Sequence, residues 1–236
     1  ALPIYSVVVV WYMRKKREFL RQRFFQQINR VRMENLRSRI SPHFTFNVLG
    51  REINQFNGSE EVKHNLMELV KYLRRSLELT EKLSVSLQDE LDFVRTYIEL
   101  ERGRVGEDFV ATITVEDGLD ATRIMIPSMI VQIPVENAIK HGLAGKDGKK
   151  ELMVYVSRET NGIRITVTDN GRGYLPQVVS ATRGTGTGLK VLYQTIQLLN
   201  TKNKSDKIRF NITNRSDGQT GTEVSVYIPF RFSYDL

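Results

Sequence analysis

The spacing of apolar residues changes at Gly103, and this change constrains the fold more than any other feature of the chain. Before it, apolar residues recur at helical intervals, as in the run Leu66, Leu69, Val70, Leu73 and Leu77. After it, apolar and polar residues alternate as in half-buried strands at residues 109–115, 152–156, 163–167, 208–212 and 224–228, with helical patterns at 128–141 and 189–200. The sequence therefore predicts an α+β chain in which a helical part precedes an α/β sandwich, one sheet with helices over one face.

The helical part is expected to hold two long helices followed by a shorter third one. Gly58-Ser59 separates the long pair, which we interpret as an antiparallel hairpin. Because a two-helix hairpin cannot enclose a core alone, two chains are expected to pair as a homodimer with a four-helix bundle. Ser86-Leu-Gln-Asp89 resembles a capping box and predicts the start of the third helix, which should end near Gly103. Residues 40–103 are thus assigned to dimerisation and residues 104–236 to the sandwich.

Residues 1–13 carry no charge and are followed directly by Arg14-Lys15-Lys16-Arg17. As a helix they would span about 20 Å, less than the ~30 Å hydrocarbon core of a bilayer. We interpret them as the end of a transmembrane helix. The basic flank then places the residues after about 14 on the cytoplasmic side of the cell (inner) membrane. A buried N-terminal strand is the alternative, because the run contains consecutive valines.

The net charge of +8 is concentrated in one segment. Residues 14–39 hold ten Lys or Arg against two acidic residues, so the rest of the chain is balanced. Apolar residues there, Leu20, Phe24, Ile28 and Val31, predict a basic membrane-proximal helix suited to a coiled coil. Its position favours anionic lipid headgroups, and we expect no nucleic-acid partner; a nucleic-acid-binding arm is the alternative. The absence of cysteine excludes disulfides and thiolate metal sites.

Residues 40–47 place a histidine at a bend of the predicted helix. His43 follows Pro42, and a proline inside a helical pattern usually marks a kink. Asn47 lies one turn further on, so it shares a face with His43. A neutral imidazole is a competent nucleophile near pH 7. The alternative is an ordinary histidine on a helix face.

Three polar or glycine-rich clusters fall in the second half of the chain. Asn137, Lys140 and His141 lie within one helical turn and offer an amide oxygen for a hard cation and two cationic groups for phosphate. Residues 169–173, Asp-Asn-Gly-Arg-Gly, place a carboxylate at a strand end, and residues 184–188, Gly-Thr-Gly-Thr-Gly, precede a helix as in phosphate-binding loops. Taken alone, they are also compatible with a solvated helix face, a hairpin turn and an ordinary loop.

Two common nucleotide-binding motifs do not fit these glycines. A P-loop needs Lys directly after its last glycine, whereas Lys190 comes two residues after Gly188. The dinucleotide fingerprint needs G-x-G-x-x-G after a strand, and the spacing here is G-x-G-x-G.

The order of the three clusters resembles the ATP-binding domain shared by histidine kinases, gyrase and Hsp90-type ATPases. Residues 127–142 are similar to the run P-x-x-x-x-Q-P-L-V-E-N-A-I-K-H-G of LytS-type sensor histidine kinases. Residues 40–47, Ile-Ser-Pro-His-Phe-Thr-Phe-Asn, resemble the phospho-acceptor box I-N-P-H-F-L-F-N of that family. Residues 87–102 are similar to its segment L-x-x-E-L-x-x-x-x-x-Y-L-x-I-E-x-x-R.

The resemblance implies a role for each of these residues. His43 would accept the γ-phosphoryl group of ATP, with Asn47 in the same site, and Asn137 would hold Mg²⁺ against the triphosphate. Lys140 and His141 would lie by the phosphates. The remaining expected contacts are Asp169 to the adenine amine, Gly171 and Gly173 around the base, Gly184, Gly186 and Gly188 beside the phosphates, residues 174–183 as the lid, and Thr222 bracing the aspartate.

Some positions depart from the family pattern. Ser41, Thr45 and Gly50 stand where Asn, Leu and Asn are usual, and Gly50 softens a helix interior by roughly 1 kcal/mol relative to Ala. Ile133 occupies the position of the water-activating glutamate of the related ATPases, which favours transfer over hydrolysis. Glu136 is our candidate for the general base.

The resemblance implies a sensor histidine kinase that phosphorylates its own histidine from Mg-ATP and passes the phosphoryl group to an aspartate of a response-regulator receiver domain. An ATP-binding but catalytically weak scaffold that relays signals is the alternative.

Overall fold

The computed structural model describes residues 11, 13–16, 65, 68, 69, 71–73, 75, 76, 78, 79, 82–174, 187–201, 203 and 205–234. The predicted phospho-acceptor box with His43 and Asn47, the helical hairpin before residue 65, and Gly184 and Gly186 lie outside these residues. Within the described part, no helix is both long and apolar enough to cross a membrane. The transmembrane, coiled-coil and four-helix-bundle assignments therefore stay predictions.

A mixed five-stranded sheet forms the centre of the described part. Its strands are β2 (Phe109–Val115), β4 (Lys150–Glu159), β5 (Gly162–Asp169), β7 (Thr222–Pro229) and β6 (Arg209–Asn214), in that spatial order. β2 pairs parallel with β4, and the other neighbours are antiparallel. The five strands predicted from alternation are all present, each at or within two or three residues of its expected bounds.

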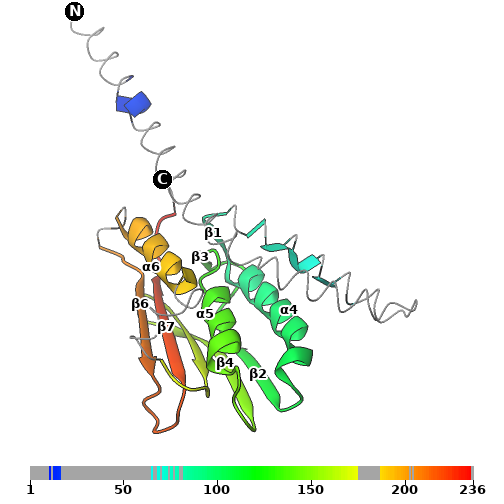
Figure 1. Ribbon diagram of the computed structural model, residues 1–236. Helices are drawn as coiled ribbons and strands as arrows, with labels where there is room; N and C mark the ends of the chain where they lie inside the picture. The colour runs from blue at the N-terminus through cyan, green and yellow to red at the C-terminus, as the bar shows by residue number, and fades with distance from the viewer. Residues whose placement is uncertain are drawn as a thin grey trace, which may run out of the picture.

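Three helical segments cover one face of this sheet (Figure 1). They are α4 (Leu87–Val105), α5 (Gln132–Asn137) with its continuation η1 (Ala138–Gly142), and α6 (Thr187–Asn200). Inward residues of β4 and β5 such as Val154 and Ile163 are fully buried beneath them, whereas Met153 and Tyr155 on the opposite face are exposed. The predicted sandwich, with one sheet and helices on one face, is confirmed.

The third predicted helix starts at the expected capping box. Ser86 is its N-cap and accepts a hydrogen bond from the backbone N–H of Asp89 (3.0 Å), and Gly106 closes α4 three residues beyond Gly103. The side chains of Leu91 and Val94 are fully buried in the same core as the sheet. α4 and the sheet therefore share one hydrophobic core. The domain boundary predicted after residue 103 stays a prediction.

A short two-stranded ribbon, which the sequence did not predict, joins the segment before α4 to the segment before α5. It consists of β1 (Ser84–Ser86) and β3 (Met125–Pro127), paired antiparallel. The helix predicted over residues 128–141 begins later than expected, at Gln132. Residues 128–131 form a turn instead, in which Met129 has a left-handed φ of 69°.

Candidate functional site

The helix that carries the predicted Asn137, Lys140 and His141 changes type in the middle of this cluster. α5 ends at Asn137, and residues 138–142 continue as a π-helical turn. The N–H of Leu143 donates to the carbonyl of Ala138, five residues back, at 2.8 Å. π-helical turns inside α-helices occur frequently at functional sites. This wider turn places Gly142 next to Asp169, the last residue of strand β5.

Asn137 has its side-chain amide fixed by the backbone of its own helix. Its Nδ2 donates to the carbonyl oxygen of Ile133, one turn earlier, at 2.7 Å. Because Nδ2 points toward the helix backbone, the amide oxygen Oδ1 points away from Ile133. An amide oxygen is a suitable ligand for a hard cation such as Mg²⁺.

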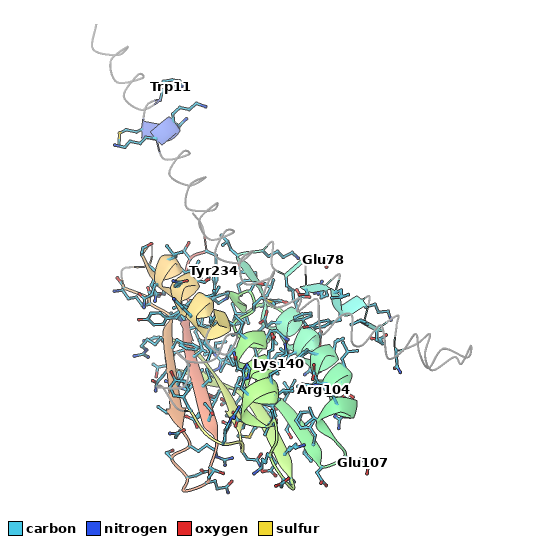
Figure 2. The ribbon with its side chains drawn as sticks, in the orientation of Figure 1. Trp11, Glu78, Arg104, Glu107, Lys140 and Tyr234 are labelled. Atoms are coloured by element: carbon cyan, nitrogen blue, oxygen red, sulfur yellow. The ribbon has the colours of Figure 1, made fainter. Side chains whose placement is uncertain are left out.

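Glu136 and Lys140 form an ion pair along the same helix. Lys140 Nζ lies 2.6 Å from Glu136 Oε1, and both side chains are mostly buried. Figure 2 shows Lys140 on this segment and Arg104 near the end of the neighbouring α4. The ion pair keeps the candidate base and the candidate phosphate ligand together, so a bound polyphosphate would compete with Glu136 for the ammonium group.

His141 is half-buried next to two cationic side chains. Burial, Lys140 and Arg172 lower the pKa of its imidazole below the ordinary value, while Glu136 raises that pKa to a smaller extent. The Arg172 Nε also donates to the backbone carbonyl of His141 at 2.8 Å. The imidazole is therefore neutral at pH 7, and the charge available for a phosphate at this point comes from the neighbouring Lys and Arg.

Asp169 ends strand β5 and is almost completely buried, with 4% of its surface exposed. Its Oδ1 accepts hydrogen bonds from the backbone N–H groups of Gly171 (2.8 Å) and Thr222 (3.4 Å). Burial raises the pKa of the carboxyl, and these hydrogen bonds and Arg215 partly offset that rise. Oδ1 is thus held by the backbone, and the Thr222 side chain also forms a hydrogen bond with the carboxyl group.

Three glycines let backbone approach this aspartate more closely than any side chain would permit. A Cβ on Gly142 would lie 2.7 Å from Asp169 Oδ1, and a Cβ on Gly171 would lie 2.1 Å from the carbonyl oxygen of Gly142. Gly221 has a φ of 140°, and a Cβ there would lie 1.9 Å from the Asp169 carbonyl oxygen. Gly142 and Gly221 were not among the predicted site residues, although each directly follows or precedes one.

Gly173 and Gly188, the other described glycines of the predicted site, lie on either side of residues 175–186, which are outside the described part. Gly173 has a φ of 84°, and Asn214 Oδ1 accepts a hydrogen bond from the next backbone N–H, that of Tyr174, at 2.6 Å. A Cβ on Gly173 would lie 2.8 Å from the same oxygen. Gly188 is the second residue of α6, so the predicted phosphate-side loop leads into that helix.

The part of the chain that the structure describes offers few side chains that could bind a metal ion. No group of three or more His, Asp or Glu side chains converges there. Mg²⁺ is commonly bound through one or two protein oxygens together with substrate phosphates, and Asn137 supplies one such oxygen. Asn137 Oδ1 could thus serve as one protein ligand of a cation that is bound together with a polyphosphate.

A buried polar cluster lies between α4, α5 and the preceding helical residues. Gln132 Nε2 lies 3.5 Å from the hydroxyl of Tyr72, whose ring stacks on that of Tyr97 with centroids 5.8 Å apart. Within the part of the chain that the structure describes, Tyr97 Oη, Glu101 Oε1 and Gln132 Oε1 are buried without a hydrogen-bond partner. Burial raises the pKa of Tyr97, and Glu136 and Glu101 raise it further.

Two protein-family models match consecutive parts of the chain. Residues 31–109 match the model for histidine kinase. Residues 122–231 match the model for the histidine kinase-, DNA gyrase B-, and HSP90-like ATPase. The second match contains α5, η1, β5 and α6, the elements that carry the predicted nucleotide-binding residues.

Curated relatives are similar over most of the chain. Sensor histidine kinase YpdA of Escherichia coli (strain K12) is 28% identical over 205 residues, which cover 86% of this chain and 35% of YpdA. Sensor histidine kinase/phosphatase LytS of Staphylococcus aureus (strain MRSA252) is 32% identical over 197 residues, which cover 80% of this chain and 33% of LytS. The chain thus spans about a third of the length of these relatives.

Solved structures show a more distant likeness. The histidine kinase domain of the blue-light activated histidine kinase from Erythrobacter litoralis EL346 is 15% identical, with a TM-score of 0.48, and the match covers 87% of this chain and 94% of that one.

Proposed function

Because this chain belongs to the histidine kinase family, we propose that it is the kinase portion of a sensor protein that transfers the γ-phosphoryl group of ATP to His43. The phosphoryl group then passes to an aspartate of a response-regulator receiver domain. The proposal assigns ATP to the described site and the acceptor histidine to the part matched by the histidine kinase model, residues 31–109.

The observation that carries this proposal is the meeting of Asp169 with the end of the Asn137 helix. Asp169 is almost completely buried, with Gly142 and Gly171 against it, and its Oδ2 is the oxygen that we assign to the ligand. A planar base fits against such side-chain-free backbone, and the carboxylate accepts a hydrogen bond from its exocyclic amine. An adenine is recognised in this way, whereas the oxygen that guanine carries at the same place would meet the carboxylate as a second acceptor.

The phosphates of the same nucleotide would extend along α5 and η1. Lys140 and Arg172 supply positive charge there, and the imidazole of His141 supplies an N–H donor. Mg²⁺ bound through Asn137 Oδ1 and the phosphates would neutralise charge that develops on the leaving ADP. The predicted loop before α6 would cover the other side of the phosphates.

In the proposed reaction, an imidazole nitrogen of His43 attacks the γ-phosphorus in line with the leaving β-phosphate oxygen. A phosphorus–nitrogen bond forms, the bond to the bridging oxygen breaks, and ADP departs. The imidazole N–H proton is lost, and Glu136 is the proposed acceptor. Glu136 becomes available for this role when the triphosphate draws Lys140 away from it.

The wider context is also a proposal. The chain is expected to act as a homodimer, with residues 1–13 ending a membrane-spanning helix and the kinase portion in the cytoplasm. The uncharged run before Arg14 and the basic residues 14–39 support this topology.

The experiment is incubation of the chain with γ-labelled ATP and Mg²⁺, beside His43→Ala and Glu136→Gln. Kinase activity predicts an acid-labile, alkali-stable label on the wild type, none on His43→Ala, and a slower rate for Glu136→Gln with ATP affinity retained. Nucleotide binding without any label would support the signal-relaying scaffold instead.

A further inference from the structure

Helix α5 begins without a capping residue of its own. Its N-cap position is Val131, whose side chain cannot accept a hydrogen bond, and its first turn contains no acidic residue. A helix N-terminus leaves several backbone N–H groups unpaired, and burying them unpaired is costly. Ser128, Ile130 and Val131 in the turn before α5 are buried, so the N–H groups at this end of the helix need a partner from elsewhere in the chain.

The partner is Glu90, which lies on α4 and is completely buried. One carboxylate oxygen accepts from the N–H of Met129 at 2.9 Å. The other accepts from the N–H groups of Val131 at 3.1 Å and Gln132 at 3.2 Å. A carboxylate at a helix N-terminus also interacts favourably with the positive end of the helix dipole.

The same contacts hold the turn in a conformation that its residues do not favour. Met129 has a φ of 69°, which is uncommon for a large side chain and is kept only where the surroundings impose it. The residue before it is fixed as well. Ser128 Oγ donates to the carbonyl of Leu79, and the Ser128 N–H donates to the carbonyl of Leu83 at 3.1 Å.

The fixed turn lies close to the proposed ATP contacts. Asn137, at the end of α5, lies only five positions after Gln132, whose N–H donates to Glu90. Over so short a helix, about 1.5 Å per residue, a displacement at the first residue is transmitted to the last. The position of Asn137, and of Lys140 in the following turn, thus depends on a carboxylate 47 residues earlier in the chain than Asn137.

We propose that Glu90 is a positioning residue for the nucleotide-binding helix: it sets the place of α5 and thereby the affinity for Mg-ATP. The inference rests on the proposed function in assigning ATP to α5. It adds that α4, the last helix of the helical part predicted from the sequence, determines whether α5 is held in the binding position.

The test compares Glu90→Gln with Glu99→Gln in the full chain. Glu99 is a matched control because it lies on the same helix and its side chain, paired with Arg102 at 3.0 Å, is 65% exposed. Amide hydrogen exchange at residues 129–132 and the dissociation constant of Mg-ATP are measured for both variants and the wild type. Glu90→Gln is expected to exchange faster at these amides and to bind Mg-ATP about tenfold more weakly, since hydrogen bonds to a charged acceptor are stronger than those to an amide oxygen. Glu99→Gln should match the wild type.

A double variant separates positioning from general loss of stability. Glycine adopts a φ near 69° without strain, so Met129→Gly in the Glu90→Gln background should favour the native turn. We expect it to recover severalfold of the lost Mg-ATP affinity. A residue that served only to stabilise the fold would not give this rescue, because glycine increases the entropy of the unfolded chain.

The outcomes distinguish the two proposals. Unchanged exchange at residues 129–132 in Glu90→Gln overturns the inference, and so does a loss of affinity that Met129→Gly leaves unrestored. If the wild type does not bind Mg-ATP, the proposed function fails, and the exchange measurement still reports on the Glu90 contacts.

Discussion

Gly142 and Asp169 are in direct contact: a Cβ added to Gly142 would lie 2.7 Å from Oδ1 of the aspartate. The contact joins the π-helical turn after α5 to the end of strand β5. The two halves of the proposed nucleotide site therefore meet at a point that has no room for a side chain.

Gly142→Ala should displace the Asp169 carboxylate. We expect it to weaken ATP binding at least tenfold and to destabilise the fold by about 1–3 kcal/mol, because overpacking of a buried site forces neighbouring groups to move. Calorimetric titration and thermal unfolding check both effects. Gly103→Ala is the control, since a Cβ there meets nothing within 4 Å and should leave ATP binding unchanged.

Asp169→Asn should separate binding from stability. The amide oxygen can keep the hydrogen bonds from Gly171 and Thr222, which leaves the NH₂ group facing the adenine amine as a second donor. We expect no measurable ATP binding. Because burial raises the pKa of Asp169, its ionised form costs stability at neutral pH, and the neutral asparagine should fold at least as stably as the wild type at pH 7. A variant that binds ATP normally would exclude Asp169 as the base contact.

The stability of the free chain should depend on the protonation of His141. Its pKa is lowered in the folded state, so below about pH 6.5 the unfolded chain binds the proton more readily and the free energy of unfolding falls. His141→Gln should remove this part of the pH dependence. Denaturant unfolding from pH 7.5 to 5.5 compares the two, and NMR titration measures the pKa directly. An imidazole pKa at or above 6.5 would contradict the environment described here.

Removal of the Tyr97 hydroxyl should be harmless. Its Oη is buried without a hydrogen-bond partner among the described residues, so Tyr97→Phe removes an unfavourable polar burial. We expect a free energy of unfolding equal to or up to about 1 kcal/mol above that of the wild type. Tyr234→Phe is the matched comparison, because the Tyr234 hydroxyl donates to the carbonyl of Met125 at 3.1 Å and its loss should destabilise the fold. A clear loss of stability in Tyr97→Phe would reveal a partner for that hydroxyl.

The features that the sequence predicted correctly are those with a local signal. Alternation located the five strands because one face of each is buried against the helices and the other is open. The Ser86 cap was predictable because its partner, the backbone N–H of Asp89, lies only three residues further on. The motif order also assigns Asp169 and Asn137 to one site, and this stays a prediction, although Gly142 of the segment that continues the Asn137 helix lies against Asp169.

Features that depend on distant contacts were not predictable in this way. Residues 128–131 continue the apolar spacing of the following helix, but hydrogen bonds to Glu90 and from Ser128 to Leu83 hold them in a turn. Gly142 looks like a helix end in the sequence, and its closeness to Asp169 follows only from the packing of η1 against β5. The ribbon of β1 and β3 was missed because three-residue strands carry too little periodicity.

The most direct test of the account is to locate the phosphoryl group. The chain is incubated with Mg-ATP, digested at neutral pH and sequenced by mass spectrometry under conditions that preserve phosphohistidine. The account predicts a phosphoryl group on His43, and its loss when Asp169→Asn prevents ATP binding. A phosphoryl group on another residue, or ATP consumed to ADP and free phosphate without any phosphorylated peptide, would contradict it.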